Sequence, residues 1–390
     1  MDAHGEICRA IDEYREKVVA VSHEIHEHPE LKFEEHLAAD LLTRAAKELG
    51  LEVERGIGGL ETAFRAEFGG DGPTVAILAE YDALPNGHSC GHNLIAGAAL
   101  SAVAGLKSIA GKFKLPGRII FLGTPAEEGG GGKIIMIDKG VMRGVDAAMM
   151  AHPTDAEWCT MPALATQHIK LKFRGHAAHA ALAPWDGSSA LAAVLQTFQS
   201  VDAMRLHLRD GSRIHGIITD GGQAVNIIPE KTECLFLARG KTSRYTEEIG
   251  ARVIRCAEAA AMATGTIVEA IIEGGYKNLI NNLSMAHRYA AHNEALGTRS
   301  PVAPDNIPTG STDMGDVSHV MPAIHPAFAI SRHGEGNCHE DAFVAHADST
   351  RGYDAMIRVA KAMAMTAYDL LAEPELMAAT KKEFATRRES

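Results

Sequence analysis

The stretch TVAILAEYDALPNGHSCGHNLIAGAALSAVAGLKSIA, residues 74–110, decides the fold class. It opens with an apolar run of strand length at 74–83 and closes with a segment of helical length and composition at 93–110. Two more strand-like runs follow, GRIIFLGTP at 117–125 and VDAAMMAHP at 145–153. This alternation predicts an α/β domain with a mixed, mostly parallel sheet flanked by helices.

The segments on either side of these strands extend the same domain. The first fifty residues have apolar positions at helical spacing and predict one helix that stops at Pro29 and a second at about 34–49. After Tyr276 the chain returns to a helix, a strand and a long C-terminal helix. The run AIHPAFAIS, residues 323–331, is a strand that can rejoin the first sheet.

Between these parts lies a segment with a different pattern, residues 165–276. Its predicted order is β-α-β-β-α-β, which is typical of a ferredoxin-like α+β domain. We therefore expect two domains, one made of residues 1–164 and 277–390 and one inserted at 165–276. A chain of 390 residues is also longer than a single hydrophobic core usually supports.

Composition and charge exclude several classes of protein. Hydrophobic residues make up 46% and charged residues 23%, as in folded proteins. The net charge of -12 and a pI near 5.9 offer no cationic surface for nucleic acid. No apolar stretch reaches the length of a membrane span, and the N-terminus is too charged for a signal peptide. We expect a cytoplasmic protein without membrane or nucleic-acid partners, whose six scattered cysteines do not form a disulfide framework.

The motif GHSCGHN, residues 87–93, carries the first chemical signal. Cys90 and His92 lie two residues apart in a loop that opens a helix. The helix dipole favours a thiolate there, and both side chains are good ligands for zinc or a similar divalent ion. Taken alone, the motif fits a buried cysteine beside a loop histidine equally well.

Glu127 and Glu128 carry the second signal, because they follow the strand at 117–125 directly. Adjacent carboxylates repel inside a cleft unless a cation compensates them, which suits one as a metal ligand and the other as a general base. A solvated turn is the alternative. His152 also follows a strand, and Asp82 ends the first one. All these residues follow the carboxyl ends of strands, the edge at which open α/β sheets hold their sites.

Other motifs are weaker. The glycine run 129–132 before Lys133 lacks the spacing of a phosphate loop and the Ser or Thr that follows its lysine. The histidines of HEIHEHPE, residues 23–30, stand among glutamates before a proline, and we read them as surface residues. His339 precedes the last long helix, with Cys338 as an alternative soft ligand. His88 is interpreted as orienting its loop, and His176 and His179 follow the first strand of the inserted segment.

Together these motifs resemble the aminoacylase and carboxypeptidase family of dinuclear metallopeptidases, in particular its amidohydrolase branch. The resemblance covers nearly the whole chain and rests on motifs in a fixed order: HEIHEHPELKFEE, AEYDALP, GHSCGHN, GTPAEEGGGGK, MMAHP, FRGHAAHAA, GGQAVNIIPE and GSTDMGDVS.

The resemblance implies a role for each of these residues. It implies two divalent ions, zinc or manganese with cobalt possible, held by Cys90, His92, Glu128, His152 and His339. It makes Glu127 the general acid and base, and Asp82 the residue that orients a ligand from behind. His179 resembles a histidine of the inserted lid domain that reaches the active site of a partner subunit, while Asn226 and Arg239 match positions that contact substrate.

The implied reaction is hydrolysis of the amide bond of an N-acyl or aroyl amino acid or a dipeptide, in a homodimer joined through the lid domain. The alternation in KLKFRG, residues 170–175, fits an edge strand able to pair with its twin. Hydrolysis of carbamoyl or ureido C–N bonds and a catalytically silent metal-binding protein are the alternatives.

The chain departs from the usual branch motifs at two places. Asn93 follows His92 where the branch has CGHD, and GSTDMGDVS replaces an acidic SEDF-type segment. Both departures resemble the p-aminobenzoyl-glutamate hydrolase and β-alanyl dipeptidase members.

Overall fold

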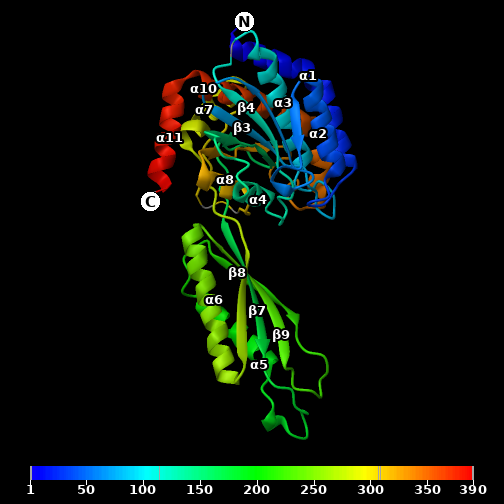
Figure 1. Cartoon of the computed structure of the whole chain (residues 1–390), viewed down its shortest axis with the longest axis vertical. Helices are drawn as coiled ribbons and strands as arrows, with labels where there is room; N and C mark the ends of the chain where they lie inside the picture. The colour runs from blue at the N-terminus through cyan, green and yellow to red at the C-terminus, as the bar shows by residue number, and fades with distance from the viewer. Residues whose placement is uncertain (1, 114, 306, 308, 389–390) are drawn as a thin grey trace. The chain divides into compact units, whose positions relative to one another are not determined.

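The computed structural model describes residues 2–113, 115–305, 307 and 309–388. It divides into two compact units. The first contains the chain up to residue 162 and most of it from residue 279 onward. The second contains residues 163–278 and a short segment at 309–315, so the predicted insertion at 165–276 falls within it. Figure 1 shows that both ends of the chain, coloured blue and red, contribute to the first unit.

A six-stranded sheet in the order β1-β2-β4-β3-β5-β11 forms the centre of the first unit. Its strands are β1 (Glu52–Arg55), β2 (Phe64–Gly69), β3 (Thr74–Ala79), β4 (Arg118–Gly123), β5 (Ala147–Met149) and β11 (Ala323–Ile324). The strands β4, β3, β5 and β11 are parallel, whereas β1 and β2 join in antiparallel fashion. The mixed, mostly parallel sheet predicted from the sequence is therefore confirmed.

The central strands β3 and β4 are apolar on both faces, as expected for parallel strands covered by helices. Their register pairs Val75 with Ile119 and Ile77 with Phe121, and all four side chains are buried. Because the two strands are parallel, the loops at their carboxyl ends emerge at the same edge of the sheet. These loops carry the predicted site.

Helices surround this sheet. They are α1 (Ala3–Glu27), α2 (His36–Glu48), η1 (Ile57–Gly59), α3 (His92–Ala110), α4 (Gly132–Asp138), α7 (Leu283–Ala295), α8 (Met314–Val320), α9 (Asp341–Ala347), α10 (Thr350–Ala372) and α11 (Pro374–Arg388). Of these, α3 packs against β3, α1 and α10. A Cβ atom at Gly97 would lie 2.3 Å from Met356 Sδ, so glycine allows α3 and α10 to approach closely.

The helix α3 corrects one expectation, since its length and composition are sufficient to cross a membrane. The protein buries 83% of the most apolar window of α3 in its interior, as in the core helix of a globular unit.

Three expected elements of the first unit are divided in the structure. The run at 145–153 forms β5 and a separate strand β6 (His152–Thr154), and the run at 323–331 forms β11 and β12 (Ala327–Ala329). β6 and β12 pair in a parallel two-stranded sheet of their own. The long C-terminal helix is interrupted at Pro374, where proline cannot continue the hydrogen-bond pattern of α10. Pro374 was a sequence signal for the last of these breaks that the expectation of a single long helix overlooked, and the pattern also missed β1 and β2.

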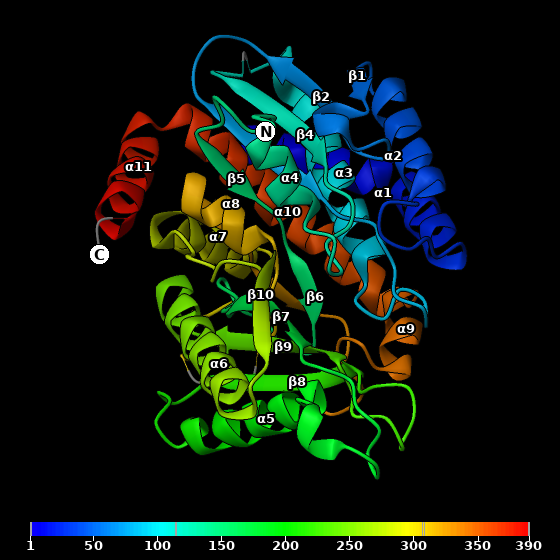
Figure 2. The same ribbon diagram turned by 60° about the horizontal axis from the view of Figure 1, so that its bottom comes forward.

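The second unit contains β7 (Ala165–Arg174), η2 (Pro184–Asp186), α5 (Ala190–Arg205), β8 (Arg213–Asp220), β9 (Lys231–Gly240), α6 (Ser243–Thr264) and β10 (Ile267–Gly274). Its antiparallel sheet has the order β10-β7-β9-β8, the ferredoxin-like arrangement that the sequence predicts. Both helices pack on the sheet and against each other (Figure 2). A core that includes Phe173 and Phe236 lies between them and the strands.

The predicted edge strand in this unit is wrong. KLKFRG belongs mainly to β7, which lies inside the sheet between β10 and β9. Its alternation arises because one face of an antiparallel sheet is covered by helices and the other is not. The edge next to β9 is formed by β8, on which Ile217 is 62% exposed and Ile218 is 41% exposed.

Candidate metal centre

The loops at the carboxyl edge of the first sheet bring the predicted ligands together. Cys90 and His92 lie after β3, where the chain turns into α3, and both are buried. Glu128 follows β4, and His152 is the first residue of β6. Each side chain is thus placed by the end of a strand or the start of a helix.

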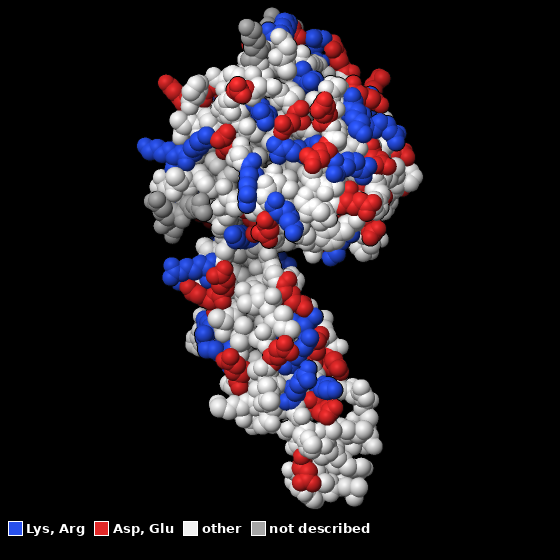
Figure 3. Space-filling view, viewed as in Figure 1, with Lys and Arg blue, Asp and Glu red and all other residues white. Residues whose placement is uncertain are grey.

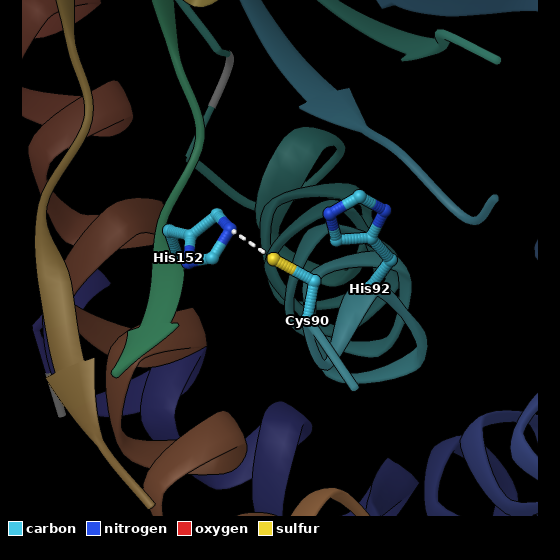
Figure 4. A group of neighbouring side chains, drawn as sticks. All are labelled: Cys90, His92 and His152. Atoms are coloured by element: carbon cyan, nitrogen blue, oxygen red, sulfur yellow. Dashed lines mark hydrogen bonds between the residues drawn. The ribbon is translucent and has the colours of Figure 1, made fainter. Parts of the chain in front are cut away.

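Cys90 and His152 face each other across this edge. Cys90 Sγ lies 3.5 Å from His152 Nε2. Figure 4 shows the two side chains directed at each other. Sulfur and nitrogen ligands of a tetrahedral zinc ion, at about 2.3 and 2.1 Å from the metal, are themselves about 3.6 Å apart. His152 Nδ1 lies 2.8 Å from its neighbour's carbonyl oxygen, that of Pro153, which leaves Nε2 directed at the thiol. The pair has the separation of two ligands of one ion.

Glu128 and His339 form a second pair with the same property. Glu128 Oε1 lies 3.4 Å from His339 Nε2, which is the separation expected for oxygen and nitrogen ligands of one ion. His339 has a left-handed backbone with φ of 74°, and its N–H donates to Ser89 O at 2.8 Å. This backbone contact fixes residue 339 beside the Cys90 loop.

The possible ligands form overlapping groups, in each of which all donor atoms lie within 4.8 Å of one another. One group is Cys90, His92 and His152, and another is Cys90, Glu128 and His339. A third joins His92 with Glu127 and Glu128. Cys90, His92 and Glu128 each belong to two of these groups. His92 Nε2 and Glu128 Oε1 are buried without a hydrogen-bond partner in the described structure, so the donor set fits a pair of divalent cations.

Asp82 supports the centre from behind. Its Oδ1 lies 3.1 Å from His92 Nδ1, and its Oδ2 accepts a hydrogen bond of 2.8 Å from the Glu128 backbone N–H. A carboxylate on one ring nitrogen holds the imidazole and directs the other nitrogen toward an ion. The position expected for Asp82 is thus the one it occupies, while its role stays a prediction.

The electrostatics of the two buried imidazoles differ in the metal-free protein. Burial, followed by the charge of His92, lowers the pKa of His152 to about 4, so His152 is neutral and ready to bind a cation. Burial also disfavours a charged His92, but the Glu80 and Asp82 carboxylates outweigh it and raise the pKa of His92. A hydrogen bond to Cys338, together with burial, raises the pKa of the Cys90 thiol. Cation binding must therefore release protons.

Asn93, the departure from the branch motif, is directed away from the centre. Its Nδ2 donates to Ser22 Oγ at 3.1 Å and to Ala347 O at 2.9 Å, and the side chain is fully buried. The amide thus ties the start of α3 to α1 and α9.

The second unit holds the other three predicted residues. His179 and Asn226 are exposed on adjacent loops, where the Ala180 N–H donates to Asn226 O at 3.0 Å. Arg239 lies on β9, and its Nη1 donates to Ser311 Oγ at 2.9 Å. The structure thus brings His179 and Asn226 together, and the roles of all three remain predictions.

Sequence reasoning missed three buried groups at the centre. Glu80 and Lys133 form a fully buried ion pair of 2.6 Å, and the ring of His325 lies 5.6 Å from that of His152. One signal was present, because Glu80 is a charged residue in an otherwise apolar strand segment and stands two positions before Asp82. His26 is also more buried than expected, since its ring stacks 6.1 Å from that of buried His88.

A separate group, His4, His292 and Asp369, also has donor atoms within 4.8 Å of one another. Here the nitrogen–oxygen distances are 2.6 and 2.7 Å, which are those of hydrogen bonds and too short for two ligands of one ion. Arg288 also donates to Asp369 at 2.6 Å. We interpret this group as an ion-pair network that joins α1, α7 and α10.

The fold and the gathered donor atoms are those expected of an amide-bond hydrolase with a metal centre. The chain belongs to the peptidase family M20/M25/M40, whose family model matches residues 76–365. The peptidases of this family are dinuclear metal enzymes.

Several known proteins are similar to this chain over most of its length. It is 38% identical to the Xaa-Arg dipeptidase of Mus musculus over 393 residues, which cover 96% of the chain and 90% of that protein. It is 29% identical to one of the subunits of the p-aminobenzoyl-glutamate hydrolase of Escherichia coli, with 96% and 93% covered. The fold matches a dinuclear metal-binding M20 peptidase from Bacillus subtilis with a TM-score of 0.73 at 19% identity, over 93% of this chain and 99% of that one.

Proposed function

We propose that this enzyme hydrolyses the amide bond of a dipeptide or an N-acyl or aroyl amino acid, with two divalent cations at the first-unit centre. The cations are held by Cys90, His92, Glu128, His152 and His339. The observation that carries this proposal is the separation of the donor atoms, 3.5 Å between Cys90 and His152 and 3.4 Å between Glu128 and His339.

The residues around the centre divide the chemical work. Two divalent ions held by these ligands would supply a water of lowered pKa and polarise the carbonyl to be attacked. Glu127 is buried within 4.8 Å of His92 and Glu128, and it accepts the proton of the attacking water. Glu127 then donates that proton to the departing amine. Asp82 holds His92 in place through these steps.

The donor set bears on the choice of metal. One thiolate and three imidazoles favour zinc, while the carboxylate of Glu128 also suits manganese, with cobalt as a possible substitute.

The substrate proposal rests on the names of the relatives and on the positively charged side chain of Arg239. The names of two relatives describe a dipeptidase for Xaa-Arg substrates and a hydrolase of p-aminobenzoyl-glutamate, and both substrates end in a free carboxylate. Arg239 offers a half-buried guanidinium for such a group, and exposed Asn226 offers an amide for a substrate carbonyl. A dipeptide is therefore the first substrate to test, followed by acyl and aroyl amino acids.

A homodimer formed through the second unit would complete the site. The loops that carry His179 and Asn226 also expose Leu182 (73%), Trp185 (77%) and Val225. The lower end of the second unit in Figure 3 is largely uncharged. Exposed apolar side chains of this size favour burial against a partner. We infer that His179 acts on the oxyanion in the active site of the partner subunit, an effect typically worth about 3 kcal/mol for one donor.

The general-base role is tested by comparing two adjacent carboxylates. Glu127→Gln should retain two ions by elemental analysis and lose about 10²- to 10⁴-fold in turnover, because it removes the proton acceptor and no ligand. Glu128→Gln should bind fewer ions. Undiminished turnover in Glu127→Gln would exclude the proposed mechanism.

The partner-subunit role is tested by mixing two inactive variants. Hybrid dimers of Glu127→Gln and His179→Ala contain one intact site and should recover part of the activity. No recovery in confirmed hybrids would show that His179 does not act across subunits. A panel of Xaa-Arg dipeptides, β-alanyl dipeptides, and N-acetyl, benzoyl and p-aminobenzoyl amino acids, with an N-carbamoyl amino acid included, would fix the substrate class.

A further inference from the structure

The buried ammonium group of a lysine side chain lies behind the metal centre. Lys133 is fully buried in the first turn of α4, and its Nζ lies 2.6 Å from Glu80 Oε2. Glu80 directly follows β3 and is also fully buried. Removing two charges from water costs several kcal/mol for each ion, so such a pair persists only where its surroundings hold it in place.

The glycine run before Lys133 provides that placement. Gly131 adopts a left-handed conformation with φ of 66° at the start of α4. A Cβ atom at Gly132 would lie 1.9 Å from Pro125 O, so only glycine allows the helix to begin this close to the loop after β4. The run GGGGK, which resembled a phosphate loop without its spacing, instead delivers a lysine side chain into the interior.

The second oxygen of Glu80 is directed at the metal centre. Glu80 Oε1 lies 3.6 Å from His92 Nε2, and neither atom has a hydrogen-bond partner in the described structure. Asp82 lies on the other side of the same ring, 3.1 Å from Nδ1. His92 therefore stands between two carboxylates, and Lys133 neutralises one of them.

We propose that Lys133 and Glu80 form a neutral ion pair that fixes the charge beside His92 and thereby sets the cation affinity of the centre. This proposal rests on the proposed function, since it assumes that His92 binds an ion. Both are positioning residues and neither is a ligand. Glu80 is fully buried and attracts a bound cation without screening by water, and Lys133, which contacts the other oxygen of Glu80, repels that cation. The two single substitutions must consequently change affinity in opposite directions.

The test measures binding of Zn²⁺ and Co²⁺ to the full-length, metal-depleted protein by competition with a chromophoric chelator at pH 7.5. Glu80→Gln removes the negative charge that faces His92 and should weaken binding about 10- to 100-fold, the usual effect of losing a partner behind a ligand. Lys133→Met leaves an uncompensated carboxylate and should tighten binding about 10-fold. The double variant should return close to the wild-type affinity.

Two controls separate charge from structure. Lys139→Met removes an exposed lysine just after the same helix and should change affinity less than about twofold. The visible spectrum of the Co²⁺ protein should be the same in all variants, because no ligand is altered. Urea unfolding of each metal-free variant reports its loss of stability independently of cation binding.

The possible results are distinct. Opposite shifts in the single variants and recovery in the double variant support the proposal. Weaker or unchanged binding in Lys133→Met, or losses that follow stability in both single variants, overturn it. An altered Co²⁺ spectrum in Glu80→Gln would make Glu80 a ligand and also overturn it. If the wild type itself fails to bind two ions, the proposed function fails; if it binds two and only the opposite shifts are missing, this inference alone fails.

Discussion

Replacing Asn93 by aspartate restores the residue usual in the branch motif, yet we expect it to damage this protein. The Asn93 amide donates to Ala347 O at 2.9 Å and to Ser22 Oγ at 3.1 Å inside the core. An ionised carboxylate has the same shape but cannot donate. It would leave the Ala347 carbonyl unpaired and place a negative charge against it.

The size of the effect follows from these contacts. An unpaired buried carbonyl costs about 1–3 kcal/mol. Burial next to carbonyl oxygens also raises the pKa of the new carboxyl, and each unit of increase costs about 1.4 kcal/mol once the group ionises. We expect Asn93→Asp to lower the free energy of unfolding by about 3–5 kcal/mol at pH 8. The loss should be smaller at pH 5, because a protonated carboxyl can donate to Ala347.

Urea unfolding of the metal-free protein at both pH values measures this effect. Asn337→Asp is the matched control, because exposed Asn337 accepts a hydrogen bond from the Cys338 N–H and an aspartate can do the same. The control should change stability by no more than about 0.5 kcal/mol. Two ions should still bind to Asn93→Asp. Unchanged stability together with altered ion stoichiometry would refute the reasoning and place residue 93 in the metal centre.

Two further predictions concern α4 and the ion-pair network. Gly132→Ala should lower the free energy of unfolding by about 1–3 kcal/mol, because the added Cβ overpacks against Pro125 O even though alanine favours helices. Gly111 has open space and an ordinary φ, so Gly111→Ala should not lower the free energy of unfolding in the same urea titration. The hydrogen bond to Asp369 raises the pKa of His4. The stabilising contribution of the His4–Asp369 pair is therefore complete below about pH 6.5 and disappears as the pH rises through the raised pKa of His4. Because His4 is partly exposed, that contribution should be below about 1 kcal/mol. His4→Gln should flatten the pH dependence of the free energy of unfolding above pH 6.5. An unchanged slope would contradict the assignment of this pH dependence to His4.

The parts of the fold that the sequence predicted share a strong local signal. The run 74–79 is apolar at every position after Thr74, and the alternation in the second unit follows from a sheet covered on one face. The break between β5 and β6 was missed because the chain stays apolar across it, and the break between β11 and β12 was missed although His325 and Pro326 lie there. The central place of β7 was missed because an alternating pattern reports which face is buried and says nothing about which neighbours a strand has.

At the site, residue type and strand ends were sufficient to place four possible ligands, Glu127 and Asp82 at one edge of the sheet, whereas His339 was assigned only through the family resemblance. They were insufficient for Lys133, because a lysine after four glycines in sequence resembles an exposed loop. Only the 1.9 Å approach at Gly132 shows why that side chain enters the core. The burial of Glu80 likewise depends on a partner more than fifty residues away.

The metal centre is assembled from both sides of the second unit, with consequences for biosynthesis. Cys90, His92, Glu127, Glu128 and His152 are translated first, whereas His339 and β12, the strand that pairs with the one beginning at His152, follow the whole insertion. For the time taken to translate more than 150 residues, the nascent protein displays a cysteine and two histidines without their last partners. The proposed ligand set is therefore complete only after the segment that follows the insertion has been translated.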